Sequence, residues 1–273
     1  MLTVAAVLMS ACDRLDTAEV PAVSKKVIFN LRGSEWTVTR AALSADGYDM
    51  SDLWIFDYVD GVCVQTLRKT SDDADMDSPS MSLEYGEHVL HFVASRGKNP
   101  TLSDGIIIWD TVSDTFLGSL SVTVGHATAD SYAVTLDRMV AKLRVAITDQ
   151  VPDNIASVTI QSAKWWKGVD YVSASASSES ELGVSITVPS SYAGTTGSLV
   201  ASVFGFSDAT EWSTDVTVTA KDGDGNVLGK VTVQDVPLRR NRVTLMSGNL
   251  FNGGGTFDVS LNEGWDDPYN MEW

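Results

Sequence analysis

The sequence predicts an all-β protein with a β-sandwich architecture, and three observations support this prediction. Ser, Thr and Val are abundant, and the 273 residues include 21 Gly. Helical periodicity is scarce, whereas many short runs alternate apolar and polar residues. These runs are about 5 to 8 residues long and are separated by Gly, Pro, Asn or Asp, a spacing typical of sandwiches. A parallel sheet would need helices between its strands.

The length leaves room for one or two domains, since domains commonly span about 100 to 200 residues. Residues 13–24, DRLDTAEVPAVS, are polar and aperiodic and include a Pro, which is typical of a tether. The predicted divisions are a signal segment at 1–11, a tether at 12–24, an N-terminal β-sandwich at 25–130 and a C-terminal β-sandwich at 131–273.

The first dozen residues, MLTVAAVLMSAC, are typical of an export signal that ends in a lipoprotein cleavage site. The segment before Cys12 is uncharged and almost wholly apolar, and the small residues Ser10 and Ala11 come directly before the cysteine. A run of 11 residues is too short to span a membrane, which takes about 20. We therefore predict Cys12 as the first mature residue and a lipid anchor. The alternative is a short buried segment with an ordinary cysteine.

The predicted N-terminal sandwich begins with two short strands on either side of Gly33. Val27, Phe29 and Leu31 alternate with polar residues before this glycine, and the pattern resumes at Trp36. A tight hairpin follows around Asp60-Gly61, a dipeptide that supplies the positive φ angles of a type I′ turn.

The return strand of this hairpin contains Cys63, which we expect to be a buried strand thiol. Residues 81–95 predict two strands joined by a turn at Gly86, and further strands are predicted at 106–110 and 114–125. Residues 98–114 also allow one helical turn.

The predicted C-terminal sandwich begins with a long strand from Val140 to Ile147, with a bulge near Lys142, and Pro152 closes it. We expect Ser173–Ser180 to form an exposed loop. The remaining strand candidates are IASVTIQSAKWW, LGVSITVPSS, GSLVASVFGF, TDVTVTAKDG, NVLGKVTVQDV, RRNRVTLMSGNLF and GTFDVSLNEGW.

The charge balance limits the possible partners, and the cysteine count limits the possible disulfides. The formal net charge is −17, from 19 Lys and Arg against 36 Asp and Glu. Such an acidic surface repels phosphate backbones, so we expect no nucleic-acid partner. With only two cysteines, no disulfide framework is available.

The residues that carry catalytic chemistry do not form a recognisable set, so we predict no enzyme, no cofactor and no metal centre. His88 and His91 are three residues apart, which on a strand points them to opposite faces, and His126 lies in a loop. No G-x-S-x-G elbow occurs, and the glycines of FNGGGTF lack the Lys of a phosphate-binding loop.

Two acidic segments raise calcium as an alternative to a plain loop. TSDDADMDSPS holds four Asp between Asp72 and Asp77 without a fixed ligand spacing, so we expect a solvated loop. DGDGN begins like a calcium loop, but Val227 and Val233 replace its required Gly and Glu. We expect a hairpin turn there.

Five tryptophans have two interpretations. They are expected to pack in a core or between domains, because Trp is highly buried on average. Alternatively, they form a surface that stacks against sugars. The residues are Trp165, Trp166, Trp212, Trp265 and Trp273.

Four segments together resemble the fimbrillin superfamily of bacterial surface pili, nearest to its FimB/Mfa-type subunits. They are the export signal, VTRAAL, LDRMVAKLRVAI and the tail RNRVTLMSGNLFNGGGTFDVSLNEGWDD. The resemblance implies two tandem transthyretin-like Greek-key β-sandwiches, export as a lipoprotein and assembly at the outer membrane.

The resemblance also implies a joining mechanism. In polymerising subunits an arginine-specific protease removes the N-terminal segment, and a strand from the next subunit fills the groove that opens. The matching position here is Arg40-Ala41, with Arg32 a poorer candidate. The alternative for Arg40 is a plain arginine at a strand end. Anchor subunits of the family instead keep the lipid and the N-terminal strand.

These observations predict a lipid-anchored or accessory subunit of a surface-exposed fimbrium at the cell outer membrane. Its partners would be other pilus subunits, through strand addition at an open sheet edge, and the outer membrane, through the lipid on Cys12. The alternative function is a surface glycan-binding lipoprotein that uses the tryptophans.

Overall fold

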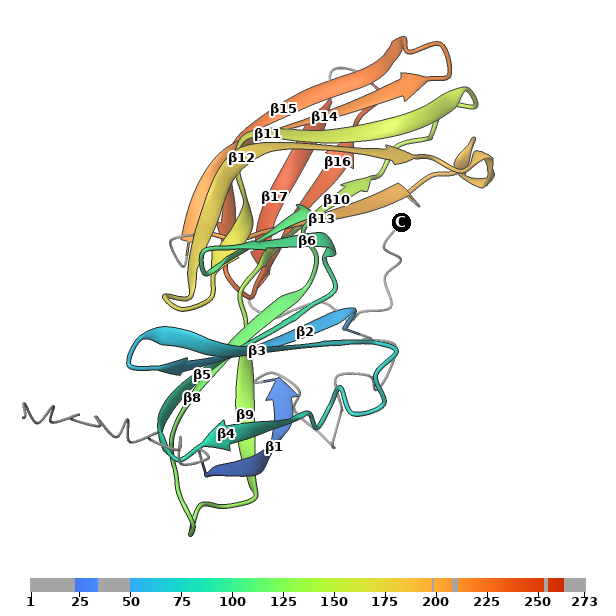
Figure 1. The fold of residues 1–273 in the computed structure, drawn as a ribbon. Helices are drawn as coiled ribbons and strands as arrows, with labels where there is room; N and C mark the ends of the chain where they lie inside the picture. Colours follow the sequence, from blue (N-terminus) through green and yellow to red (C-terminus); the bar gives the residue numbers. More distant parts are fainter. Residues whose placement is uncertain (1–22, 34–49, 198, 208–210, 253–254, 263–273) are drawn as a thin grey trace, which may run out of the picture.

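The structure, a computed structural model, describes residues 23–33, 50–197, 199–207, 211–252 and 255–262. In these ranges the only helical element is a short 3-10 turn at Ser190–Tyr192. The strands form two sandwiches (Figure 1). The predicted all-β fold of two tandem β-sandwiches is therefore confirmed.

The N-terminal sandwich is a seven-stranded sheet that folds around its own core. Its spatial order is β3-β2-β5-β8-β9-β1-β4. β9 pairs with β8 only near its end, at Asp137 and Arg138, and with β1 along Ser131–Leu136, so the sheet changes direction at β9. The strands are β1 (Ser24–Gly33), β2 (Asp52–Val59), β3 (Val62–Thr70), β4 (Ser80–Glu84), β5 (Gly86–Ser95), β8 (Thr115–Val124) and β9 (Ser131–Arg138).

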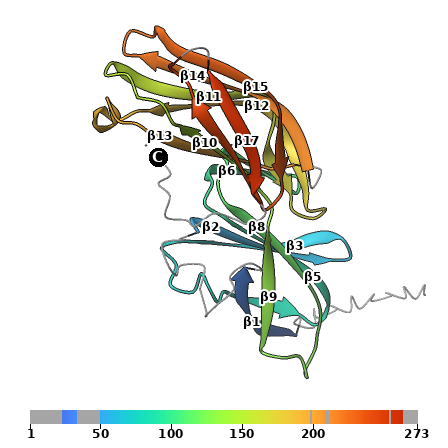
Figure 2. The same cartoon turned by 180° about the vertical axis from the view of Figure 1, so that it is seen from behind.

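The C-terminal sandwich packs two sheets face to face (Figures 1 and 2). One sheet has the order β13-β10-β16-β17, and the other has the order β15-β14-β11-β7-β6 with β12 beside β11. The strands are β6 (Lys98–Ser103), β7 (Ile106–Thr111), β10 (Ala141–Ile147), β11 (Ile155–Asp170), β12 (Ser175–Thr187), β13 (Leu199–Gly205), β14 (Glu211–Asp222), β15 (Val227–Arg239), β16 (Val243–Asn249) and β17 (Thr256–Asn262).

The order of the strands along the chain does not match their division between the two sandwiches. The β6–β7 hairpin joins the C-terminal sandwich, because Ile106–Ile108 pair with residues 168–170 of β11. β9 belongs to the N-terminal sheet. These pairings show which sheet each strand belongs to. The division of the chain into two domains near residue 130 stays a prediction.

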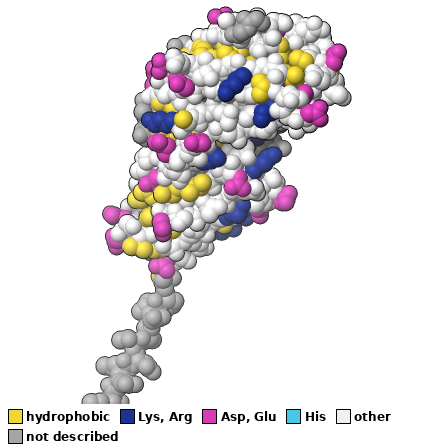
Figure 3. Space-filling view, turned by 90° about the horizontal axis from the view of Figure 1, so that it is seen from above, with side chains coloured by type: hydrophobic (Ala, Val, Ile, Leu, Met, Phe, Trp, Pro, Cys, Tyr) yellow, Lys and Arg dark blue, Asp and Glu magenta, His cyan; other side chains and the backbone are white. Residues whose placement is uncertain are grey.

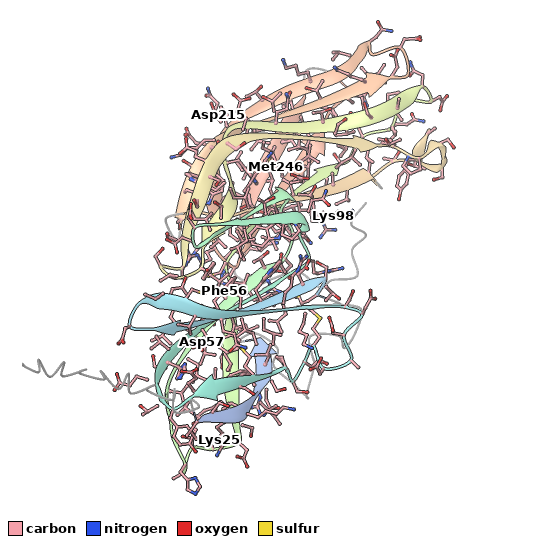
Figure 4. The ribbon with its side chains drawn as sticks, viewed as in Figure 1. Lys25, Phe56, Asp57, Lys98, Asp215 and Met246 are labelled. Atoms are coloured by element: carbon pink, nitrogen blue, oxygen red, sulfur yellow. The ribbon has the colours of Figure 1, made fainter. Side chains whose placement is uncertain are left out.

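An aromatic cluster fills the interface between the sandwiches. Phe56 of β2 stacks on Tyr171 at 3.8 Å between ring centroids, and Trp109 of β7 stacks on Phe206 at 5.4 Å. Figure 4 shows Phe56 on the side of the N-terminal sheet that faces the other sandwich. The Tyr58 and Tyr171 hydroxyls lie 3.2 Å apart across the same interface. The two sandwiches are therefore joined by a core of their own.

Most of the predicted strands and turns are confirmed. Asp60 and Gly61 have φ angles of 51° and 78°, as the predicted hairpin turn requires. The turn at Gly86 separates β4 from β5, and the segment 98–114 forms the β6–β7 hairpin in place of a helical turn.

Two local predictions are wrong. The expected Ser173–Ser180 loop is largely strand, since β12 begins at Ser175 and pairs with β11. This strand is held by backbone hydrogen bonds at the outside of the sheet, where small polar side chains are tolerated. The strand predicted from Val140 to Ile147 is present as β10, but its pairings with β13 and β16 run without a register shift, so the bulge expected near Lys142 is not formed. β9 ends at Arg138, shortly before β10 begins. The chain crosses between sandwiches at that point.

The surface carries charge of both signs over each sandwich. Figure 3 shows Asp and Glu side chains spread over the face it presents, with Lys and Arg between them. Among the residues that the structure describes, no helix is long and apolar enough to cross a membrane.

Candidate functional site

The candidate site is the slot that β1 fills in the N-terminal sandwich. Alternate side chains of this strand, Val27, Phe29 and Leu31, are 0%, 0% and 5% exposed. Phe29 meets Phe92 of β5 edge to face at 5.2 Å between ring centroids. The 2-residue period of apolar side chains seen in the sequence therefore directs one face of β1 into the core.

Backbone pairing holds β1 on both sides. It runs antiparallel to β4, with Val27 opposite Met81, and parallel to β9, with Leu31 opposite Val134. A strand in this position satisfies its own peptide groups and those of both neighbours. Loss of β1 would leave two strand edges unpaired and would expose the core between them.

Near its start, β1 is fixed by side-chain contacts as well. The Lys25 ammonium lies 3.0 Å from the Asp130 carboxylate and also donates to the Thr128 carbonyl. Figure 4 shows Lys25 at the end of the N-terminal sandwich remote from the other domain. Because the Asp130 side chain is exposed, this ion pair is a weak contact by itself.

A buried polar pair supports the strand beside the slot. His88 of β5 lies 2.7 Å from Asp57 of β2 through Nδ1, and 2.9 Å from the Glu84 carbonyl through Nε2. Glu84 is the last residue of β4, the outer neighbour of β1. The prediction that His88 and His91 point to opposite faces is confirmed, because His91 faces Tyr58 at the interface.

The residues predicted to carry processing lie outside the described residues. These are Cys12, the proposed lipid site, and Arg40-Ala41, the proposed cleavage site. Arg32, the poorer cleavage candidate, lies within β1 and pairs with Thr135 of β9. A protease would reach this bond only after the strand left the sheet.

The expectation that Cys63 is buried is wrong. Cys63 is a free, exposed cysteine, and its neighbours Val62 and Val64 are 63% and 56% exposed. β3 is the outermost strand of its sheet, so no further strand covers it. Cys63 alternates with two valines, and this pattern occurs both in strands at the edge of a sheet and in strands at its centre. The sequence alone therefore did not show that Cys63 is exposed.

Three of the tryptophans are accounted for by packing. Trp165 and Trp166 are buried, and Trp212 meets both rings edge to face at 5.1 and 5.0 Å. The Trp165 indole also donates to the Phe204 carbonyl at 2.9 Å. These rings cannot form the sugar-stacking surface of the alternative hypothesis. Trp265 and Trp273 lie outside the described residues.

The two acidic segments form turns that use their own backbone. The Asp222 carboxylate accepts from the Asp224 and Asn226 amides at 3.0 and 2.8 Å, which closes the predicted hairpin turn. In the Asp-rich loop, Asp73 accepts from the Thr70 amide at 2.8 Å. Across the residues that the structure describes, no three His, Cys, Asp or Glu side chains gather as a metal site would require.

The sequence did not identify the partners of β1. Its alternation predicted a strand, but nothing in the pattern indicated that this strand runs parallel to β9, about a hundred residues later, and separates it from β4. Such pairing depends on the path of the whole chain.

Comparison with curated proteins gives no match. Several solved structures share the fold at low identity. A provisionally assigned polysaccharide-binding protein (DUF1812) from Bacteroides thetaiotaomicron has a TM-score of 0.56 and 10% identity, over 90% of this chain and 100% of its own. A provisionally assigned adhesin from Bacteroides ovatus has a TM-score of 0.53 and 9% identity, over 84% and 88%.

A provisionally assigned cell adhesion protein from Bacteroides ovatus has a TM-score of 0.51 and 13% identity, over 90% of this chain and 99% of its own. A family model matches directly at the level of sequence, and it covers residues 101–273. This match spans more than half of the chain, and the protein therefore belongs to the family of unknown function DUF6562.

Proposed function

We propose that this protein is a non-enzymatic subunit of a bacterial surface fimbria, of the anchor or accessory type. In this proposal the lipid on Cys12 fastens it to the outer membrane, and a strand from a neighbouring subunit joins it to the fibre. The partners are other fimbrial subunits.

The observation that carries the proposal is the position of β1. It is an N-terminal strand that lies between two other strands and inserts three apolar side chains into a core. A slot of this shape accepts any strand with the same alternation, because backbone hydrogen bonds give affinity and side-chain pockets give specificity.

The order of residues along the chain supports the proposed processing step. Arg40 follows β1 in sequence, so a cut between Arg40 and Ala41 would remove the covalent link between β1 and the rest of the domain. The slot would then open without loss of β2 to β17. A subunit that escapes the cut keeps both Cys12 and β1, and it would end a fibre at the membrane.

The relatives that share the fold support a surface role. Two of the Bacteroides structures are named as an adhesin and as a cell adhesion protein. Their likeness to this chain is one of fold, and the proposal of adhesion or fimbrial assembly for this chain rests on the β1 slot.

Mass spectrometry of the native N-terminus tests the proposal directly. An acylated Cys12 with residues 12–40 retained is expected for an anchor, whereas a start at Ala41 is expected for a polymerising subunit. The Cys12→Ala variant is expected to be released from membranes while its far-UV circular dichroism stays unchanged. A native chain that is neither acylated at Cys12 nor cut at Arg40 would contradict the proposal.

Matched lysine variants separate the two arginines. Arg40→Lys is expected to block trimming by an arginine-specific protease and the formation of SDS-resistant ladders with partner subunits. Arg32→Lys keeps the same charge and is expected to leave both unchanged, because Arg32 is paired within the sheet. Ladders that persist in Arg40→Lys would exclude strand exchange opened by this cut.

A further inference from the structure

A polar cleft lies between the two sandwiches, away from β1. It has a volume of about 390 Å³, within the range of small-molecule sites. Its floor comes from the N-terminal sheet, through His91 of β5, Ser119 of β8 and Thr135 and Asp137 of β9. The opposite side of the cleft comes from two turns of the C-terminal sandwich, which carry Tyr171 and Arg240.

Arg240 is a half-buried cation without a counter-ion. Its Nη2 atom donates to the Ser207 carbonyl at 3.2 Å and to the Ala174 carbonyl at 3.5 Å, and its buried Nε has no acceptor. It forms no ion pair with any described residue. Burial lowers the pKa of Arg240, but an arginine remains charged at neutral pH. The Arg240 side chain lines the cleft, so an oxyanion bound there would gain a charge-assisted contact with the guanidinium group.

Four further polar side chains line the cleft without a side-chain hydrogen bond to the described residues. No hydrogen bond joins the side chains of His91, Ser119, Thr135 or Asp137 to any part of the chain that the structure describes. Burial lowers the pKa of His91, so its imidazole is neutral at pH 7 and offers one donor and one acceptor. The cleft therefore presents the Arg240 cation, a carboxylate, two hydroxyls and an imidazole to whatever occupies it, while Arg138, which also lines the cleft, is paired with Asp114.

Arg240 lies in a basic stretch of a chain that is strongly acidic. Arg239, the last residue of β15, is followed in the turn to β16 by Arg240 and Arg242. The whole chain has only 19 Lys and Arg against 36 Asp and Glu. A local cluster of this kind draws anions towards the cleft against the field of the rest of the molecule.

We propose that this cleft binds an acidic saccharide unit, with its carboxylate on Arg240 and its hydroxyl groups on Asp137, Ser119, Thr135 and His91. A uronate carries one carboxylate and several hydroxyls, which matches one cation beside a mixed set of donors and acceptors. An acidic peptide side chain would use Arg240 but would leave Asp137 unpaired. This site goes beyond the proposed function and does not depend on strand exchange.

Calorimetric titration of the full chain with trigalacturonate tests the proposal, with the neutral galactose trimer as the matched ligand. Saturable binding of trigalacturonate is expected, with the neutral trimer weaker by about tenfold or more, because a charge-assisted hydrogen bond is lost. Absence of saturable binding, or equal affinity for the neutral trimer, would overturn the assignment.

Two arginine variants locate the carboxylate. Arg240→Gln is expected to weaken trigalacturonate binding by about tenfold or more. Arg239→Gln makes the same change in net charge one residue away, outside the residues that line the cleft, and is expected to stay within about twofold of wild type. Equal losses in the two variants would mean attraction to the basic turn alone, and would overturn the site.

Two further measurements test acidic peptides as ligands and provide a second variant of the cleft. Hexaglutamate is expected to bind much more weakly than trigalacturonate, and equal binding would assign the cleft to acidic peptides instead. If Arg240→Gln does not fold, Thr135→Glu places an anion in the cleft from an exposed strand position and is expected to abolish binding. Wild-type affinity in that variant would overturn the proposal. Ladder formation, measured on the same variants, reports on strand exchange separately.

Discussion

At the scale of single residues, the buried pair of His88 and Asp57 shows how this protein satisfies polar atoms in its core. His88 lies between the Asp57 carboxylate and the Glu84 carbonyl, so each of its ring nitrogens has a polar partner. Both side chains of the His88–Asp57 pair are almost fully buried. Removal of one partner would leave the other as an uncompensated polar group.

We expect His88→Ala to lower the free energy of unfolding by about 3 to 5 kcal/mol, because Asp57 would remain buried without a partner. Urea denaturation measures the change. Lys69→Ala is the control, since Lys69 pairs with Asp75 at 2.8 Å near the surface and its loss should cost less than about 1 kcal/mol. Equal effects of the two variants would contradict the assigned role of burial.

A pH dependence follows from His91. Burial lowers the pKa of His91, and the negative charge of Asp170 offsets part of this shift. The unfolded chain, with a His pKa of about 6.5, then binds a proton more readily than the folded one, so stability falls as the pH drops below that value. Melting temperatures at pH 5 and pH 7 measure the loss, and it should be smaller in His91→Asn. Parallel pH profiles for wild type and variant would show that His91 does not titrate in this range.

At the scale of elements, the two faces of β1 differ in burial. Phe29 is fully buried, whereas its neighbour Ile28 is 37% exposed on the opposite face. The backbone is held at both residues, because the Ile28 amide donates to the Asp130 carbonyl and the Phe29 amide donates to the Pro79 carbonyl. The pair therefore separates the side-chain contribution of β1 from its backbone contribution.

Phe29→Ala is expected to destabilise the protein by about 3 to 5 kcal/mol through lost burial and a residual cavity. Ile28→Ala, on the same strand, should cost less than about 1.5 kcal/mol, because its side chain remains partly in water. Hydrogen exchange should show faster opening of β1 and of the facing amides of β4 and β9 in Phe29→Ala. Unchanged exchange in these strands would argue that β1 does not separate from the sheet more easily in this variant.

For the whole molecule, the aromatic interface makes the two sandwiches one mechanical unit. Trp109 meets Trp54 edge to face at 6.4 Å and stacks on Phe206, and so links strands of both sandwiches. A buried contact of this size resembles a domain core more than the polar interface of independent domains. Force applied at one end would be carried through these rings and through the β6–β7 hairpin.

Differential scanning calorimetry should therefore show one unfolding transition for the wild type. Trp109→Ala is expected to separate it into two transitions, because the coupling between the sandwiches is weakened. Met246→Ala is the control: Met246 is fully buried within the C-terminal core (Figure 4), so it should lower the melting temperature without separating transitions. Two transitions in the wild type would show that the interface does not couple the domains.

Local patterns were sufficient to predict most strands and turns. The alternation at Val27, Phe29 and Leu31 and the Asp60-Gly61 dipeptide both depend on neighbouring residues, so the sequence contains their full explanation. The exposure of Cys63 and the strand within Ser173–Ser180 were not predicted. Both positions lie on strands at the outside of a sheet, and only the assembled sheet defines its outside.

By itself, the sequence determined the all-β class, the two-sandwich plan and the acidic charge, because alternation, turn residues and charge are properties of short segments or of composition. The tertiary structure alone decided that β1 lies between β4 and β9, that the β6–β7 hairpin joins the second sandwich, and that polar side chains of both sandwiches line one cleft. These features bring together residues that are far apart along the chain. Such contacts form through burial and backbone pairing over the whole fold, so no local pattern encodes them.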